Sequence, residues 1–273
     1  MNRIQRGFRL LGDSWEVLKA DRELLVLPVI AFVCFLIVAA SFGAGVFAVG
    51  GFSEGGMGAA TYVLLAGFYF VAYFVGIFFN AALIGAATIR LEGGDPTIAD
   101  GLALAYRRVG RIAAWAAISA TVGLILRALE ERAGILVRIV ISLIGAAWSA
   151  ITFFVVPVLL YEERSAPGAV KRSAEIFKQR WGEEFTGSGS LALGMFLLLV
   201  PLGGVVYLLT YLSVPAAVVV GVVAIGILGA AFAAMNGIFA AALYRYAVKG
   251  EVSWGFSGDD LQGAFRRRRS AGL

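Results

Sequence analysis

The stretch FFNAALIGAATIRLEGGDPTIADGLALAYRRVGR, residues 78–111, decides the fold. An apolar segment ends at Arg90, a Gly-Gly turn follows, and a short amphipathic helix opens at Asp95 and Pro96. Asp95 is expected to cap this helix, with Pro96 at its first position, where a missing N–H costs nothing. One face of the helix is apolar and the other charged, which is typical of a helix lying in the membrane interface. The apolar stripe consists of Ile98, Leu102, Ala105, Val109 and Ile112.

The composition indicates an integral membrane protein. Of the 273 residues, 60% are hydrophobic and only 15% are charged, and the mean hydropathy is +0.87. An ordinary soluble domain of this size carries much more charge. The net charge of +5 does not point to nucleic acid, because the basic residues flank apolar segments and form no stripe with interleaved aromatic residues.

The sequence also excludes several kinds of catalytic chemistry. It contains no His, which removes imidazole general bases, Ser-His-Asp triads and His-ligated metal sites. The single cysteine, Cys34, lies within an apolar segment and is interpreted as a packing residue. No phosphate-binding loop, nucleophile elbow or metal-ligand cluster is present. We therefore expect a protein without a cofactor that is not an enzyme.

The predicted fold is all-α, a polytopic membrane helical bundle with six transmembrane helices. A single transmembrane domain is expected over residues 1–249, followed by a basic cytoplasmic tail over 250–273. Each apolar segment is long enough to cross a bilayer. The spans are predicted at about 24–49, 60–89, 112–129, 139–160, 191–212 and 214–244.

Residues 3–22 and 165–181 repeat the amphipathic pattern of the quoted stretch. The chain then reads as three degenerate units, each an interfacial helix followed by two spans. Few residues are identical between the units, so the repeat rests on pattern alone. The additional stripes are Ile4, Phe8, Leu11, Trp15 and Leu18, and then Val170, Ala174, Phe177 and Trp181.

The distribution of basic residues predicts the orientation. With a cytoplasmic N-terminus, 20 Lys and Arg residues lie on the cytoplasmic side and three, Arg127, Arg132 and Arg138, on the other. The positive-inside rule then places both termini and all three interfacial helices in the cytoplasm. We expect a multi-pass protein of the plasma membrane.

Four pieces of the sequence, residues 14–28, 93–97, 130–132 and 153–157, together carry a resemblance to a known family. They resemble uncharacterised bacterial membrane proteins, mostly actinobacterial, that are catalogued as a domain of unknown function. The resemblance extends to about Lys249 and implies six spans. More distantly, the alternation of amphipathic helices and span pairs is similar to the membrane domain of some glycerophosphodiester phosphodiesterases. The sequence has neither their catalytic half nor any His, so their activity is not implied.

Asn80 and Asn236 are the clearest polar residues within spans, and each lies about nine residues before the cytoplasmic end of its span. They are candidates for the lining of a small polar pocket, since polar groups inside membranes often mark substrate paths. The alternative, which we favour, is that they form hydrogen bonds between helices. In both cases the two side chains are expected to face the interior of the bundle.

Three other groups are candidate sites. Pro201, Gly203 and Gly204 are expected to kink or interrupt the fifth span, as in some transporters. A cluster at the outer end of the third span is interpreted as a salt-bridged helix end, although a gate to an external cavity is the alternative. Its members are Arg127, Glu130, Glu131 and Arg132. The pair Glu162 and Glu163 is interpreted as solvated charge.

Two functional hypotheses follow from these patterns. The first is a non-enzymatic membrane protein that binds anionic lipid or membrane partners through its cytoplasmic amphipathic helices, because cations near a membrane surface attract acidic lipids. The second is a small transporter or permease with a polar site near Asn80 and Asn236. An embedded lipid-modifying enzyme is the weakest option, because no convergent catalytic set is present.

Overall fold

The computed structural model describes residues 3–51, 58–131, 133–181, 187–211 and 213–256. Within these ranges the chain forms ten α-helices and no strand, which confirms the all-α prediction. The helices are α1 (Arg3–Ala20), α2 (Glu23–Ala48), α3 (Ala59–Leu91), α4 (Ile98–Arg107), α5 (Val109–Glu131), α6 (Ile135–Ile151), α7 (Val155–Tyr161), α8 (Ala166–Trp181), α9 (Gly187–Thr210) and α10 (Val214–Lys249).

Five helical segments of the described chain are long and apolar enough to cross a membrane. They are α2, α3, α5, the segment Ile135–Tyr161 that contains α6 and α7, and α10. The side chains of α9 are described only from Leu198 to Thr210, which is a shorter apolar helix. A membrane protein is therefore supported, and the count of six spans stays a prediction.

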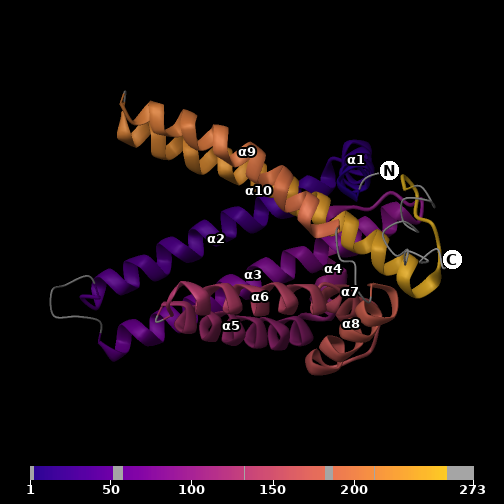
Figure 1. Ribbon diagram of the computed structural model, residues 1–273, viewed down its shortest axis with the longest axis horizontal. Coiled ribbons are helices and arrows are strands. Elements are labelled where there is room, and N and C mark those ends of the chain that lie inside the picture. The colour runs from indigo at the N-terminus through magenta and orange to yellow at the C-terminus, as the bar shows by residue number, and fades with distance from the viewer. Residues whose placement is uncertain (1–2, 52–57, 132, 182–186, 212, 257–273) are drawn as a thin grey trace.

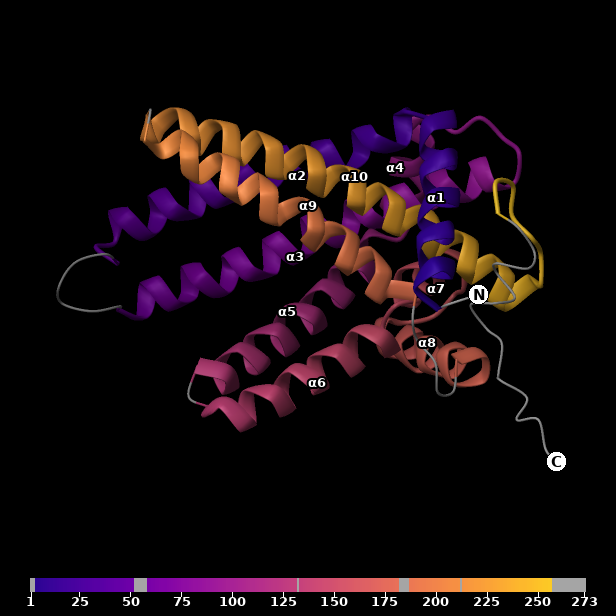
Figure 2. The same ribbon diagram turned by 45° about the horizontal axis from the view of Figure 1, so that its top comes forward.

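The helices form three hairpins that project from a common base. α2 packs on α3, α5 on α6, and α9 on α10. Figure 1 shows these pairs extending away from α1, α4, α7 and α8, which lie together at one end. Figure 2 shows the pair α5 and α6 diverging from the other two pairs. We call this end the base and define it as α1, α4, α7 and α8 together with residues 81–91 of α3 and 234–247 of α10.

Burial is concentrated in the base. In α3, residues 81–88 are all buried, whereas Thr61 is the single buried residue of segment 59–80. In α10, residues 234–247 are mostly buried, whereas the buried positions of segment 214–233 are all Gly or Ala. Beyond the base, α3 and α10 therefore each present an apolar segment of about 20 residues, which is the length that crosses a bilayer.

The three helices predicted to be interfacial pack on the hairpins in a cyclic order. α4 packs on α3, and α8 packs on α7 and more lightly on α5 and α6. Each of these helices thus contacts the hairpin that precedes it in the chain. α1 instead packs on α9 and α10, which form the third of the three hairpins. The order of contacts therefore closes into a ring.

The helix in the quoted stretch begins later than expected. Thr97 Oγ1 accepts a hydrogen bond from the Asp100 N–H (3.2 Å), and Asp100 Oδ2 accepts one from the Thr97 N–H (2.9 Å). These reciprocal bonds form a capping box, which satisfies two helix-end donors at once. The prediction that Asp95 caps the helix with Pro96 at its first position is therefore wrong. Asp95 instead forms an ion pair with Arg90 at 3.7 Å.

α4 and α3 approach closely through glycine. A Cβ atom on Gly101 would lie 2.5 Å from the carbonyl oxygen of Ala82 and 3.2 Å from the Cβ of Ala86. On the facing helix, a Cβ on Gly85 would lie 3.1 Å from Leu104. The apolar face of α4 is thus used for packing inside the protein.

The predicted fourth span is interrupted between α6 and α7. Ser173 of α8 bridges the interruption, because its Oγ accepts a hydrogen bond from the Phe154 N–H (3.1 Å) and donates one to the Ile151 carbonyl. Pro157 lies in the first turn of α7, where its missing N–H has no helical partner to lose. The span predicted over 139–160 agrees with the segment Ile135–Tyr161, which is long and apolar enough to cross a membrane. The segment consists of two helices, and α8 supplies the groups that stabilise the turn between them.

Replacing Ser173 by Ala is expected to lower the free energy of unfolding by about 1–2 kcal/mol, because the buried Phe154 N–H and the partly buried Ile151 carbonyl lose their partner. Denaturant unfolding of the purified protein in detergent, followed by circular dichroism, measures the change. Ser149→Ala is the matched control, since that exposed hydroxyl bonds only to the Gly145 carbonyl of its own helix. Equal losses in the two variants would contradict the bridging role of Ser173.

The buried faces of α1 and α8 are turned by one residue from the predicted stripes. Trp15, predicted to lie in the stripe, is 45% exposed. Hydrophobic periodicity missed the serine at the centre of each face, because a serine is buried there for its small size and its hydrogen bonds. The buried residues are Ser14, Val17 and Leu18 in α1, and Ala169, Ser173 and Ile176 in α8. The side chains of Ile4, Phe8, Leu11 and Trp181 lie outside the described part of the chain.

Candidate functional site

Arg245 is the buried centre of an ion-pair cluster in the base, and its two acidic partners, Glu92 and Glu251, have side chains that are 46% and 53% exposed. The whole Arg245 residue is only 8% exposed. Nη1 lies 2.9 Å from Glu92 Oε1, and Nη2 lies 2.9 Å from Glu251 Oε2. Nη1 also donates to the Thr88 carbonyl at 3.4 Å. A planar guanidinium suits this bridging of two carboxylates, so Arg245 ties α10 to the end of α3 and to the chain that follows α10.

Glu162 is the centre of a second cluster, between α7 and α8. Its carboxylate accepts hydrogen bonds from Arg164 Nε (2.7 Å), Arg172 Nε (3.1 Å) and the Tyr244 hydroxyl (3.2 Å). Arg111 Nη1 donates to its main-chain carbonyl at 3.4 Å. Glu162 therefore joins the start of α5, the start of α8 and the end of α10.

The two acidic residues of the 162–163 pair have different surroundings. The Glu163 side chain is 82% exposed, in agreement with the prediction of solvated charge, and lies 3.7 Å from Arg108. The Glu162 side chain is only 20% exposed. For Glu162 the prediction was wrong, because residues distant in sequence converge on its carboxylate.

The two clusters are adjacent through two tyrosines. Tyr161 precedes Glu162, Tyr244 precedes Arg245, and the two rings are stacked with centroids 6.0 Å apart. We call these residues with their ionic partners the polar belt. The carboxylates of the belt are held by Arg and Tyr, so the belt joins helix ends and presents no unengaged acid and base pair. Within the described ranges, no group of three or more His, Cys, Asp or Glu residues is placed to hold a metal ion.

The chain after α10 folds back over the base, and we call residues 250–256 the strap. Gly250, with φ of +73°, reverses the chain at the end of α10. The main-chain N–H of Trp254 donates to the main-chain carbonyl of Leu91 at 3.3 Å. The guanidinium of Arg90 lies 5.1 Å from the centre of the Trp254 ring. Phe256 is buried in the core cluster. The strap therefore fastens the ends of α3 and α10 together.

Two carboxyl groups beside the base, those of Glu162 and Asp21, have pKa values shifted in opposite directions. Burial alone would raise the pKa of Glu162, but the hydrogen bonds from Arg172 and Arg164 outweigh it and hold this pKa below its usual value of 4.5. Burial raises the pKa of Asp21 above its usual 3.8, although a hydrogen bond from the Glu23 N–H favours the ionised form. As the pH falls, protonation of Glu162 therefore destabilises the fold, whereas protonation of Asp21 stabilises it.

Because Glu162 has a lower pKa in the fold than in the unfolded chain, its ionised form stabilises the protein. This stabilisation is complete above the unfolded value of 4.5 and is lost as the pH falls through the folded pKa. We expect Glu162→Gln to be less stable than the parent at pH 7 and the difference to shrink below pH 4.5. Melting temperatures of both proteins between pH 3 and pH 7 test this expectation. A difference that stays constant would contradict it, and the comparison cancels the opposite contribution of Asp21.

The two predicted asparagines do not converge on one site. Asn80 is half-buried, and its Oδ1 lies 3.6 Å from the position that a Cβ on Gly237 would take. Asn236 is exposed, so the prediction that it faces the bundle interior is wrong. The contact face of α10 is set by Gly237, where a Cβ would lie 2.5 Å from Leu83. Asn236 lies about 100° away around the helix, and a transporter site at the two asparagines is therefore not supported.

The predicted break in the fifth span is absent. α9 is continuous through Pro201, and a Cβ on Gly203 or Gly204 would meet nothing within 4 Å. Membrane helices tolerate proline when neighbouring groups satisfy the freed backbone. The helix is therefore not interrupted at these residues, and the alternative of a kink at Pro201 stays a prediction.

The predicted cluster at the outer end of α5 is an exposed set of polar contacts. Arg127 pairs with Glu131 at 3.2 Å, as predicted from their spacing, and also donates to the Tyr69 hydroxyl of α3. The main-chain carbonyl of Glu130 accepts a hydrogen bond from Arg138 Nε at 3.2 Å. Arg132 lies outside the described residues. The contacts agree with a salt-bridged helix end.

A family profile matches residues 59–255, from the start of α3 into the strap. The chain belongs to DUF6159, a family of unknown function. This confirms the resemblance to proteins catalogued as a domain of unknown function. The DUF6159 match includes the polar belt and most of the strap, whereas α1 and α2 precede it. Comparison with curated proteins and with solved structures finds no match.

Sequence reasoning missed the polar belt of this DUF6159 protein, because its members are far apart in the chain. For the packed faces of α1 and α8, by contrast, the sequence does contain one local signal. Residues 14–19 read SWEVLK and residues 173–178 read SAEIFK, so both contain Ser-x-Glu, two apolar residues and Lys. Ser14 and Ser173 are both buried, and so are Val17 and Ile176. The shared pattern identifies the packed face that the apolar stripes placed one residue away.

Proposed function

We propose that this protein is a non-enzymatic, six-span protein of the bacterial plasma membrane whose cytoplasmic base binds anionic lipid. The observation that carries the proposal is an asymmetric distribution of exposed side chains along the hairpins. Aromatic residues are exposed at both ends, and exposed cations are concentrated at the base.

The length of the exposed segments supports the placement of the bilayer. Segments 59–80 and 214–233 are apolar and little buried. At about 1.5 Å per residue, some 20 residues cover the ~30 Å hydrocarbon layer. Asn80 and Asn236 then lie at its cytoplasmic boundary, where an exposed amide reaches water and headgroups. The base lies at the membrane surface, in agreement with the predicted orientation.

Exposed aromatic residues mark the two boundaries of this layer. Tyr62 and Tyr211 are exposed near the far ends of the hairpins, and Trp15, Tyr106 and Trp254 are exposed on the base. Tyr and Trp are enriched at both membrane interfaces. The larger set of exposed cations lies at the base, and each of them contributes about 1 kcal/mol near an anionic leaflet. They include Arg22, Arg107, Lys171 and Lys178.

The apolar stripes have a different role from the one expected from the sequence. Leu102 of α4 and Phe177 of α8 pack against the core cluster. Lipid contact is therefore assigned to the exposed aromatic and basic side chains. The three interfacial helices and the hairpins that they contact form the ring of contacts, and this ring carries the exposed aromatic and basic side chains. The similar arrangement of the three units favours the proposed internal repeat.

Replacing Arg22, Arg107, Lys171 and Lys178 together by Gln is expected to reduce the retention of anionic phospholipid by at least about tenfold, since each cation contributes about 1 kcal/mol. Native mass spectrometry of the protein purified from mixed anionic and zwitterionic lipid measures retention. Zwitterionic lipid is expected to be retained equally by the variant and the parent.

Arg138→Gln is the control, because it removes a cation at the opposite end of the hairpins and should leave the lipid preference unchanged. Cysteines introduced at Gly55 and Gly258, in a chain with Cys34 replaced by Ser, report the sidedness in intact cells. An unchanged anionic preference in the fourfold variant would reject the lipid role. Labelling of position 258 from outside would reject the orientation.

A further inference from the structure

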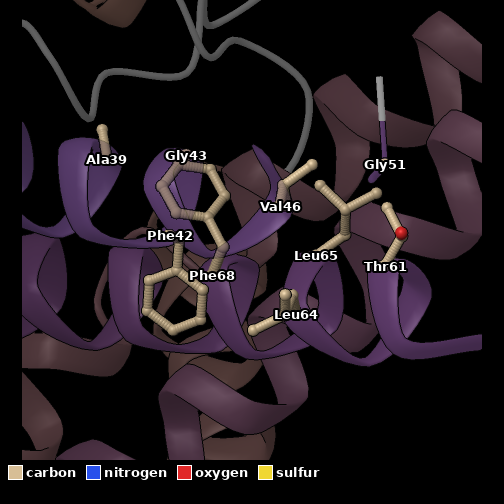
Figure 3. A pocket seen from close by; sticks show the side chains of 9 residues that line it. All are labelled: Ala39, Phe42, Gly43, Val46, Gly51, Thr61, Leu64, Leu65 and Phe68. Atoms are coloured by element: carbon tan, nitrogen blue, oxygen red, sulfur yellow. The ribbon is translucent and has the colours of Figure 1, made fainter. Parts of the chain in front are cut away.

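We propose that a cavity between α2 and α3, at the end of the hairpin away from the base, binds one acyl chain of a phospholipid. The inference rests on the proposed membrane placement and adds a specific lipid site to it. The cavity has a volume of about 350 Å³. Figure 3 shows its lining side chains, which come from both helices of the hairpin; they include Ala39, Phe42, Gly43, Thr61, Leu65 and Phe68.

The lining selects a hydrocarbon. Among the described residues that line the cavity, Thr61 alone has a polar side chain, and this residue is 1% exposed. A buried water needs two to four polar partners, and each water occupies ~30 Å³, so about ten waters would share a single hydroxyl. Apolar cavities of ~150 Å³ stay dry and take small apolar molecules. This larger cavity is within the range of ~300–1,000 Å³ that holds small-molecule ligands.

Small residues and two aromatic rings form the cavity. Phe42 and Phe68 lie with ring centroids 5.9 Å apart, and their planes are inclined by 58°. A Cβ on Gly43 would meet nothing within 4 Å, so this position leaves space open. A Cβ on Gly51 would lie 2.7 Å from Val46 and 2.9 Å from Thr61 Oγ1, so the backbone of Gly51 closes one end.

The position and the size identify the occupant as a lipid chain. The α3 wall begins at Thr61, beside the exposed Tyr62 that we place at the interface. The wall continues to Phe68, so the cavity extends about 10 Å into the hydrocarbon layer at 1.5 Å per residue. A helix of a partner protein, about 10 Å across, does not fit between the two walls, whereas a single extended chain does.

The test uses the full chain in vesicles of phosphatidylcholine and phosphatidylglycerol that contain a phospholipid with a diazirine in one acyl chain. After irradiation, crosslinked peptides are quantified by mass spectrometry. We expect peptides covering 39–46 and 61–68 to carry at least about fivefold more label than the exposed face of α6. Gly43→Leu fills the cavity and should lower their label to the level of α6. Gly76→Leu is the control and should leave the label on these peptides unchanged, because Gly76 is an exposed α3 position where a Cβ meets nothing within 4 Å.

The outcomes separate this proposal from the proposed function. Equal label on α2, α3 and α6 would overturn the cavity site and leave the membrane placement intact. No label on any hairpin would overturn both. A diazirine-bearing free fatty acid that labels the same peptides as strongly as the phospholipid would overturn the assignment to a phospholipid. Ala39→Leu fills the same space and replaces Gly43→Leu if the latter loses the helical circular dichroism of the parent.

Discussion

Replacing Glu92 and Glu251 together by Gln is expected to lower the free energy of unfolding by about 1–3 kcal/mol, because the buried Arg245 loses its charged partners. The two carboxylates neutralise Arg245, whose side chain is only 10% exposed. Their loss leaves a buried charge without a counterion, which costs more than the loss of an exposed ion pair. Denaturant unfolding in detergent micelles measures the change.

A triple variant that adds Arg245→Met tests the cause. It removes the unpaired charge while keeping an apolar stem, and it should recover most of the lost stability. Glu131→Gln with Glu163→Gln is the matched control, because the same charge is removed at side chains that are 66% and 82% exposed. A triple variant no more stable than the double variant would show that the cluster does not act through its charge.

Replacing Gly101 by Val is expected to cost about 3 kcal/mol, because overpacking at a closely packed contact forces the backbone to move. Even the Cβ would lie 2.5 Å from the Ala82 carbonyl oxygen, and this oxygen belongs to rigid helix backbone. α4 should separate from α3 before the rest of the protein unfolds. Hydrogen exchange of the 98–107 amides, read together with the melting temperature, measures the effect.

Gly110→Val provides the comparison for Gly101→Val. Gly110 lies near the start of α5, and a Cβ there would meet nothing within 4 Å. Val has a higher helix propensity than Gly, so this substitution should be neutral or slightly stabilising. If both variants lost the same stability, the contact between α3 and α4 would not be the cause of the loss.

The hairpins were predictable from the sequence because long apolar segments and flanking charges act locally. The ends of α5 and α10 came within a few residues of expectation for this reason. The break before α7 was not predictable, because it depends on Ser173, which lies 19 residues after Phe154. The cap of α4 was misplaced by two residues, because Thr97 and Asp100 satisfy each other better than Asp95 can.

The polar belt was outside the reach of periodicity. Arg245 lies 153 residues from Glu92, and no local pattern joins them. The direction of Asn236 was also not predictable, because a packed face of α10 is decided by the glycine that α3 can approach. In each case the sequence does not say which helices contact each other. An amphipathic stripe indicates that one face of a helix is buried, but it does not identify the helix that packs against that face.

The ring of contacts among α1, α4 and α8 has a consequence for biosynthesis. α4 and α8 can dock as soon as the ribosome has delivered them, since their hairpins are already made. α1 is synthesised before all of these helices, yet its partners α9 and α10 follow the other two hairpins in the chain. Its buried Ser14 and Val17 therefore remain uncovered until α9 and α10 have been made. Docking of α1 thus requires this third hairpin, and a nascent chain abandoned before it displays α1 to membrane quality control.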